Sequence, residues 1–235
     1  MLILLYHHIS RLSPKTLIRG LFTTPNRFEW QVKWLLRQGY QFTTFQKSDP
    51  EMFSSLSSKE VILTFDDGSV SVFKNGFPIL DKLGIPAVLF PISSFIEQNE
   101  KIIPSNSDRT PLSFVSREQI RKLVDAGWEL GSHLHTHKPV TELSDSELLS
   151  ELNESKTILE EISGKPVITL AYPYGIYDER TLKMAADCGY RFGLTTDQTP
   201  IGVNPLLELS RIAVKGASWY HRYYFLNSLS RHLHK

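Results

Sequence analysis

Five stretches of this 235-residue sequence share one pattern: apolar residues recur at helical spacing, a glycine follows, and a short apolar run comes next. Glycine adopts the left-handed backbone conformation that closes the last turn of a helix, so each glycine marks a predicted helix end. The predicted helices are residues 27–38, 70–83, 116–126, 144–163 and 178–188. Helices that alternate with apolar runs indicate an α/β protein.

The apolar runs predict strands, because they are short and apolar almost throughout. They are residues 2–6, 61–65, 87–90, 128–131, 167–171, 191–195 and 207–214. Such runs are typical of parallel strands that are covered on both faces. Seven strands with about six helices favour either a doubly wound sheet or a barrel, and the length predicts one domain over residues 1–235.

Composition narrows the possible chemistry. Lys plus Arg number 26 against 25 Asp plus Glu, and this balance argues against a dedicated nucleic-acid-binding protein. Cys188 is the only cysteine, which excludes a disulfide framework and a zinc site built on several thiolates. A metal site would therefore use carboxylates and histidines. The eight histidines form three groups: His7 and His8; His133, His135 and His137; and His221, His232 and His234.

Nothing in the sequence predicts a targeting or membrane-spanning segment. The opening run MLILLY has no basic residues before it and stops after six residues, so it predicts a buried strand rather than a signal peptide. No segment approaches the roughly 20 apolar residues that cross a bilayer. We therefore expect a cytoplasmic protein. Two long connections, residues 46–59 and 92–115, are expected at the surface, and the second is either a lid or rim of the site or a mobile excursion.

Two adjacent carboxylates, Asp66 and Asp67, directly follow the strand predicted at residues 61–65. Neighbouring carboxylates repel each other unless a cation or a proton offsets their charge, which favours a functional site. The alternative is a solvated turn, because Asp-Gly is a common turn pair.

Three histidines, His133, His135 and His137, directly follow the strand predicted at residues 128–131. A helical turn would bring His133 and His137 to one metal ion, whereas an extended chain would place all three on one face. The motif lacks the glutamate that lies between the histidines of zincins, so Asp66 or Asp67 is the available general base.

Two further groups follow predicted strands, namely Tyr6-His7-His8 and Tyr172-Pro173-Tyr174-Gly175. Each alone is weak evidence, because tyrosine, proline and glycine are common in ordinary turns. The carboxyl ends of parallel strands, however, face one rim of an α/β fold. We therefore expect the carboxylates, the histidines and these two groups to converge there.

These motifs resemble a known family. TFDDG, the HxxxH of GSHLHTH and the AYPYG turn are similar to those of the polysaccharide deacetylases of carbohydrate esterase family 4, the NodB-homology domain. The opening LLYHHIS, with FTTPNRFEWQVKWLLRQGY behind it, resembles the poly-N-acetylglucosamine deacetylase branch, in which one motif is circularly permuted to the N-terminus. The resemblance spans residues 4 to about 214. It implies a distorted (β/α)7 barrel that removes N-acetyl or O-acetyl groups from sugars with a divalent metal, commonly zinc.

The resemblance also implies roles for individual residues. Asp67, His133 and His137 would be the metal ligands, and Asp66 would be the general base. A carboxylate close to a cation stays ionised and can accept the proton of a water molecule.

Two further roles come from the same resemblance. His7 would be the general acid that protonates the leaving amine, and a histidine that titrates near neutrality suits this role. The backbone N–H of Tyr174 would help to hold the oxyanion, and Pro173 lies beside it in the same turn. We interpret His8 as structural. His135 has three possible roles: it supports the ligands without binding the metal, it lies at the surface, or it is an alternative ligand.

The sequence departs from the family pattern at three places. Ala171 stands where the third motif commonly begins with arginine, Leu134 stands where Ser or Thr is usual, and the usual C-terminal motifs are not recognisable. Arg211, on the last predicted strand, would either replace the missing arginine beside Asp66 or form an ordinary structural ion pair.

A C-terminal helix is predicted at about residues 217–233. Trp219, Tyr223, Leu226 and Leu233 fall at helical spacing and predict a face that either docks on the barrel or contacts a membrane surface.

The sequence thus predicts a Zn²⁺-dependent hydrolase that removes acetyl groups from N-acetylhexosamine units. Its expected partner is an acetylated carbohydrate of the cell envelope, an exopolysaccharide or a glycan precursor, and not nucleic acid. The alternatives are an amidohydrolase of the same fold that acts on a small cyclic amide or ureide, and a catalytically silent carbohydrate-binding relative.

Overall fold

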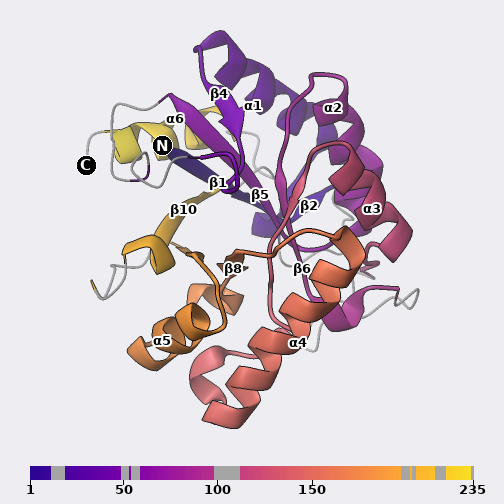
Figure 1. The fold of residues 1–235 in the computed structure, drawn as a ribbon. Helices are drawn as coiled ribbons and strands as arrows, with labels where there is room; N and C mark the ends of the chain where they lie inside the picture. The colour runs from indigo at the N-terminus through magenta and orange to yellow at the C-terminus, as the bar shows by residue number, and fades with distance from the viewer. Residues whose placement is uncertain are drawn as a thin grey trace.

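Seven parallel strands form a ring that is covered by helices (Figure 1). This computed structural model describes residues 1–11, 19–48, 53, 59–97, 112–196, 202, 205–214 and 221–233. Around the ring the strands follow chain order, and the last strand pairs with the first. They are β1 (Leu2–Tyr6), β5 (Glu60–Asp67), β6 (Val88–Pro91), β7 (Glu129–Leu130), β8 (Thr169–Ala171), β9 (Phe192–Thr196) and β10 (Leu209–Ala213).

The ring closes between β7 and β8 through one residue, Ser132. Its N–H donates to the carbonyl oxygen of Thr169, and its carbonyl accepts from the N–H of Ala171. The prediction of a distorted (β/α)7 barrel is therefore confirmed, and the doubly wound alternative is wrong.

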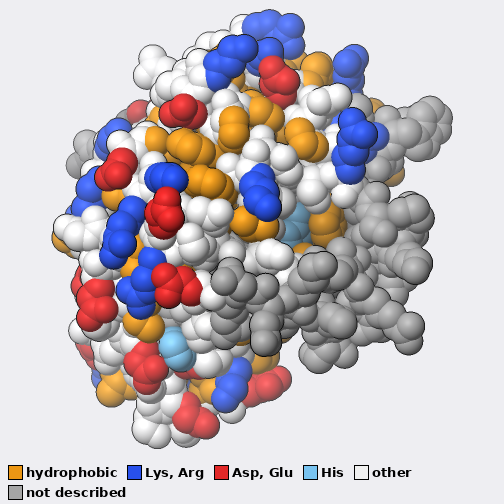
Figure 2. Space-filling model, turned by 90° about the vertical axis from the view of Figure 1, so that its right-hand side faces the viewer, with side chains coloured by type: hydrophobic (Ala, Val, Ile, Leu, Met, Phe, Trp, Pro, Cys, Tyr) orange, Lys and Arg blue, Asp and Glu red, His pale blue; other side chains and the backbone are white. Residues whose placement is uncertain are grey.

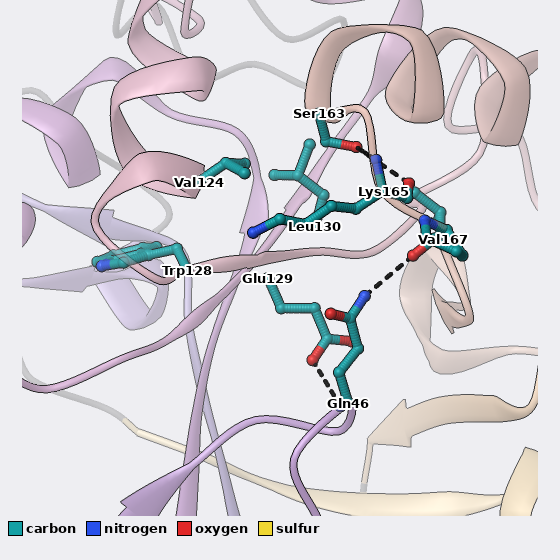
Figure 3. A pocket seen from close by; sticks show the side chains of 9 residues that line it. Gln46, Val124, Trp128, Glu129, Leu130, Ser163, Lys165 and Val167 are labelled. Carbon is teal, nitrogen blue, oxygen red and sulfur yellow. Dashed lines mark hydrogen bonds between the residues drawn. The ribbon is translucent and has the colours of Figure 1, made fainter.

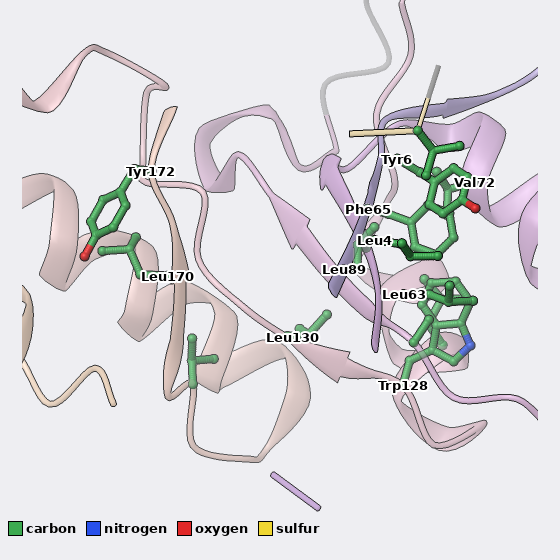
Figure 4. Close-up of a cluster of buried hydrophobic side chains, with 14 of the residues drawn as sticks. Leu4, Tyr6, Leu63, Phe65, Val72, Leu89, Trp128, Leu130, Leu170 and Tyr172 are labelled. Carbon is green, nitrogen blue, oxygen red and sulfur yellow. The ribbon is translucent and has the colours of Figure 1, made fainter. Parts of the chain in front are cut away.

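Both faces of the strands are buried, which explains why the sequence runs are apolar throughout. Within β1 and β5, Leu4, Tyr6, Leu63 and Phe65 belong to the large core between strands and helices (Figure 4). The neighbouring side chains point into the ring, where they form a second core. Its buried members are Ile3, Phe45, Ile62, Val88, Phe90, Ala171, Phe192 and Leu194.

The glycine positions correctly predict where the helices end. All five glycines have positive φ angles, between 64° and 89°. Ser116 and Ser144 cap their helices in reciprocal capping boxes, and Asp178 caps a third. The helices are α1 (Pro25–Arg37), α2 (Phe77–Asp81), α3 (Arg117–Asp125), α4 (Asp145–Ser163) and α5 (Glu179–Asp187).

The helix predicted at residues 70–83 is present over residues 70–81, but it is not a regular α-helix throughout. A π-helical turn, Val72–Gly76, precedes α2, which has Pro78 in its first turn. Proline has no N–H to continue the hydrogen-bond ladder of a preceding helix, and it favours the start of a new one. Pro78 was the signal in the sequence for this irregularity within the helix.

Three short strands were not predicted. β2 (His8–Ile9) pairs with β3 (Phe22–Thr23), and β4 (Gln41–Thr43) pairs with the start of β5. Segments of two or three residues are too short for a periodic pattern. Of the two long connections, residues 49–52, 54–58 and 98–111 lie outside the described residues.

The C-terminal helix α6 (His221–Leu233) docks on α1, but not through the predicted face. Phe225 is buried and packs against Trp30 and Trp34, whereas Tyr223 is 64% exposed and Leu226 is 38% exposed. The helical spacing was counted from Trp219, whereas the buried positions of α6 are Phe225 and Leu229. Trp219 and the side chain of Leu233 lie outside the described parts of the chain, and contact with a membrane surface stays a prediction.

None of the helices that the structure describes is long and apolar enough to cross a membrane. On the face in Figure 2, acidic and basic side chains lie interspersed, in agreement with the formal net charge of +1.

Candidate functional site

The predicted site residues gather at the carboxyl ends of the strands. β5 ends at Asp66 and Asp67, and the loop after β7 carries His133 and His137. The chain then supplies the short turn Pro173–Gly175 after β8.

Asp67, His133 and His137 each offer a ligand atom, and the three atoms lie within 4.8 Å of one another. The Nε2 atoms of His133 and His137 lie 3.5 Å and 3.7 Å from Oδ1 of Asp67. Two of these residues have left-handed backbone, with φ angles of 67° at Asp67 and 63° at His137. Such angles are uncommon for residues other than glycine and occur frequently at functional sites.

The chemistry of this donor set fits a divalent metal ion. The Nδ1 atom of His133 lies 2.7 Å from the carbonyl oxygen of Ala171, an arrangement that leaves Nε2 free to bind. Burial and the nearby His133 lower the pKa of His137 to about 4, so its imidazole is neutral at neutral pH. A carboxylate together with two imidazoles is typical of a catalytic Zn²⁺ site.

Asp66 lies beside this group and pairs with a buried arginine. Both guanidinium NH₂ groups of Arg211 donate to Asp66, each at 2.7 Å. Burial alone would raise the pKa of Asp66, but the charges of Arg211 and His133 hold it below its usual value. Asp66 is therefore a carboxylate that stays ionised although it is only 2% exposed. Arg211 thus lies beside Asp66, where an arginine that replaces the one missing from the third motif would have to lie.

Tyr174 is held in a strained turn at the edge of the site. Its φ angle is 60°, its side chain is 60% exposed, and its ring centre lies 4.9 Å from that of His137. Thr195 Oγ1 donates to the carbonyl oxygen of Gly175 at 2.7 Å, which anchors the turn. Gly175 itself has a φ of 72°, and a Cβ there would lie 2.3 Å from Thr196 Oγ1. Only glycine fits at this position.

The other predicted histidines have different surroundings. His7 directly follows β1, whose last residue, Tyr6, pairs with Phe65 of β5, so His7 lies near the strand end that carries Asp66 and Asp67. His8 is buried and stacks on Phe22, with ring centres 4.5 Å apart. His135 points away from the group, because its Nδ1 lies 2.9 Å from Oγ of Ser93 and its Nε2 lies 3.5 Å from Glu154.

Comparison with known proteins decides the family. The model of the family described as polysaccharide deacetylase matches residues 54–193. The chain belongs to this family. A poly-beta-1,6-N-acetyl-D-glucosamine N-deacetylase of Staphylococcus aureus is 24% identical over 198 residues, which cover 80% of this chain and 65% of the relative. The Bacillus subtilis protein YxkH is 29% identical over 197 residues, or 83% of this chain and 64% of that protein. The chain thus spans about two thirds of the length of these curated relatives.

A solved structure supports the fold of this family member over its whole length. The Streptococcus pyogenes deacetylase PplD, in complex with acetate, superposes with a TM-score of 0.78 and 25% identity, and the match covers 97% of each chain. The family model leaves out His7 and Arg211, which β1 and β10 bring to the site as neighbours in the ring.

One residue of the site region was missed in the sequence. Glu151, on α4, accepts hydrogen bonds from the loop that carries the histidines. It occupies a position on the same buried face of α4 as Leu148, Leu152 and Leu159. A carboxylate among apolar residues of a helix face was the available signal, because buried charges need dedicated partners.

Proposed function

We propose that this family member is a metal-dependent deacetylase, a single domain over residues 1–235, that hydrolyses the acetamide of N-acetylhexosamine units in a carbohydrate. The substrate would belong to the cell envelope, an exopolysaccharide or a glycan precursor. The observation that carries this proposal is the convergence of Asp67, His133 and His137 beside the ionised, buried Asp66. The names of the relatives support it: one is an N-deacetylase of an N-acetylglucosamine polymer, and PplD was solved with acetate.

Asp67, His133 and His137 would hold the metal ion, for which we propose Zn²⁺. When bound, such an ion supplies Lewis acidity, which polarises an acetyl carbonyl and makes a water molecule more acidic. Each residue contributes to this in a different way. The Asp67 carboxylate offsets the charge of the cation, and the two neutral imidazoles leave part of that charge for the substrate.

Asp66 would act as the general base. Its carboxylate accepts the proton of the attacking water, and Arg211 keeps it ionised for this step. The bidentate pair also fixes the orientation of the carboxylate, since both of its oxygens are bound. A base held in one orientation needs no rearrangement during the reaction.

His7 and Tyr174 would complete the reaction. An amine leaves only when it is protonated, and we assign this proton transfer to the imidazole of His7. We assign the backbone N–H of Tyr174 to the developing oxyanion, because a fixed N–H stabilises charge that appears in the transition state. The exposed ring of Tyr174 places this turn at the surface, where a polymer has access.

Acetate release tests the proposal. The protein is assayed on N-acetylated oligosaccharides and on lipid-linked or nucleotide-linked N-acetylhexosamines, before and after chelation. We expect chelation to abolish acetate release and Zn²⁺ to restore it. Full activity after exhaustive chelation would refute the metal-dependent reaction. Release of product only from cyclic amides or ureides would favour the alternative amidohydrolase.

Two histidines provide a matched pair of variants for this assay. His137→Ala removes a proposed ligand, and we expect it to lose Zn²⁺ binding and acetate release together. His135→Ala, two residues away, removes a side chain that faces Ser93, and we expect it to retain both. Binding of sugar without acetate release by the wild-type protein would instead indicate a silent carbohydrate-binding relative.

A further inference from the structure

Glu151 is a buried carboxylate that lies outside the proposed metal centre but contacts its loop. The residue is 8% exposed. Its Oε2 accepts from the backbone N–H groups of His135 and Thr136, both at 2.8 Å, and its Oε1 accepts from the hydroxyl of Thr136. One side chain therefore satisfies two consecutive N–H groups of the segment that joins His133 to His137.

This segment has a backbone that does not form by itself. Leu134 and His137 have φ angles of 62° and 63°. Left-handed backbone is unfavourable for both residue types and persists only where surrounding contacts fix it. The carbonyl groups of the segment are bound from one side, since the N–H groups of Ser93 and Ser94 donate to Leu134 and His135 at 3.2 Å and 3.0 Å. Glu151 binds the N–H groups from the other side.

The helix that carries Glu151 is well suited to hold a loop. α4 has 19 residues, and its first turn is fixed by the capping box of Ser144. One turn after Glu151, the hydroxyl of Ser155 accepts from the hydroxyl of Ser132 at 2.7 Å, and Ser132 Oγ accepts from the N–H of Leu134 at 3.1 Å. Two polar residues on one face of this helix thus hold the segment, Glu151 directly and Ser155 through Ser132.

We infer that Glu151 is a positioning residue for the proposed metal centre: it fixes the backbone between His133 and His137, so that both imidazoles converge with Asp67 before a metal ion binds. The inference rests on the proposed function. Glu151 acts through the loop and does not touch the reacting atoms. A ligand set that is already in place binds its metal without a further cost of ordering the loop.

Zn²⁺ affinity, measured by competition with a chelator of known affinity, tests this inference. We expect Glu151→Ala to bind Zn²⁺ about 10–100-fold more weakly than the wild type, the range for residues that orient metal ligands. We expect Glu151→Gln to stay within a few-fold of the wild type, because its amide oxygen still accepts from both N–H groups and its NH₂ group can donate to Thr136. A purely structural residue would lower the melting temperature without this difference in affinity.

Glu154→Ala is the matched control. Glu154 lies one turn along the same helix, carries the same charge, and has a side chain that is 52% exposed. We expect it to bind Zn²⁺ as the wild type does. Equal affinities of folded Glu151→Ala and Glu154→Ala would overturn the inference, and so would equal losses in Glu151→Ala and Glu151→Gln.

A metal-free measurement and a milder variant keep the test decisive. Amide hydrogen exchange of His135 and Thr136 in the metal-free wild type is expected to be slow, and faster in Glu151→Ala. If Glu151→Ala does not fold, Thr136→Val replaces it, with a few-fold loss of affinity expected and an unchanged affinity contradicting the inference. Failure of the wild type to bind Zn²⁺ would refute the proposed function instead, so the two failures are distinguishable.

Discussion

Two buried carboxylates lie at opposite ends of the barrel, and their environments give opposite results. Asp66, at the carboxyl end, is 2% exposed, and Arg211 binds both of its oxygens. Glu129, at the amino end, is 4% exposed and accepts from neutral groups, among them the backbone N–H of Gln46 at 2.9 Å (Figure 3). Burial raises the pKa of Glu129 to about 7, whereas the pKa of Asp66 lies below its usual value.

The difference shows what keeps a buried carboxylate ionised. Neutral donors lower the pKa of Glu129 too, but not enough to offset its desolvation. At Asp66 the charge of Arg211, in bidentate contact, and that of His133 do offset it. The carboxyl group at the amino end therefore keeps its proton up to about pH 7, whereas the one at the carboxyl end stays ionised.

Removal of the Asp66 charge is expected to have the largest effect, a loss of turnover. Asp66→Asn lowers kcat for acetate release by about 10²–10⁴-fold, the usual contribution of a general base. Zn²⁺ affinity changes much less, because Asp67 and both histidines remain. Glu129→Gln, an equally buried amide substitution at the other end, is the control and retains its turnover. Wild-type turnover in Asp66→Asn would contradict the role of Asp66 as the general base.

Removal of the partner of Asp66 is expected to affect stability and pH dependence together. Arg211→Met leaves an unpaired buried carboxylate and lowers the free energy of unfolding by about 3–5 kcal/mol, measured by urea denaturation. Because the guanidinium no longer lowers the pKa of Asp66, the acidic limb of the pH–rate profile moves to higher pH. Arg211→Lys keeps the charge without the bidentate contact and has a smaller effect on both. An unmoved acidic limb in folded Arg211→Met would contradict the role of the pair.

Glu129→Gln is expected to stabilise the protein at neutral pH. Below about pH 4.5, Glu129 is protonated in both the folded and the unfolded state; between pH 4.5 and 7 only the folded state keeps the proton. Wild-type stability therefore falls as pH rises through this window, by on the order of 3 kcal/mol, and the variant lacks this loss. Urea denaturation at several pH values measures the difference, which grows up to about pH 7. A difference independent of pH would show that Glu129 is not neutral in the fold.

The smallest effect is expected at Thr169. Its hydroxyl donates to Glu129 at 3.4 Å, a long contact that lowers the pKa of this carboxyl. Thr169→Val changes stability by less than about 1 kcal/mol and moves the upper end of the Glu129 pH window further upward. The same denaturation series measures this shift. A shift to lower pH would contradict the assignment of Thr169 as a donor to the carboxylate.

Local signals were enough to predict the helix ends, the strands and the rim at their carboxyl ends, whereas the resemblance to the family favoured a barrel over a doubly wound sheet. Glycine has a specific conformational use after a helix, so Gly39 and Gly164 located helix ends without tertiary information. The adjacent Asp66 and Asp67, and the closely spaced histidines, each followed a strand that was clear from its composition. Since parallel strands end at one rim, the topology alone brought these residues together.

The features that could not be predicted from the sequence depend on contacts between distant segments. His135 contacts Ser93, Glu151 binds the histidine loop, and α6 buries Phe225 against α1. Each of these contacts joins residues far apart in the sequence, so a local pattern does not predict the partner. Glu129 was missed for the same reason, because the loop around Gln46 that covers it lies far away in the chain. Pro78 was a local signal whose effect on the helix ladder was overlooked.

The order of the strands also has a consequence for synthesis of the protein. β1, the first strand to be made, has β10 as one of its two neighbours, and Asp66 is separated from Arg211 by 145 residues. At roughly 5–20 residues per second, a ribosome takes about 7–30 s to cover that interval. During this time the nascent barrel has an open strand edge and a carboxylate without its counter-ion. Such an edge favours pairing with other chains. A chaperone that binds the nascent chain in this interval would therefore increase the fraction of molecules that fold rather than aggregate.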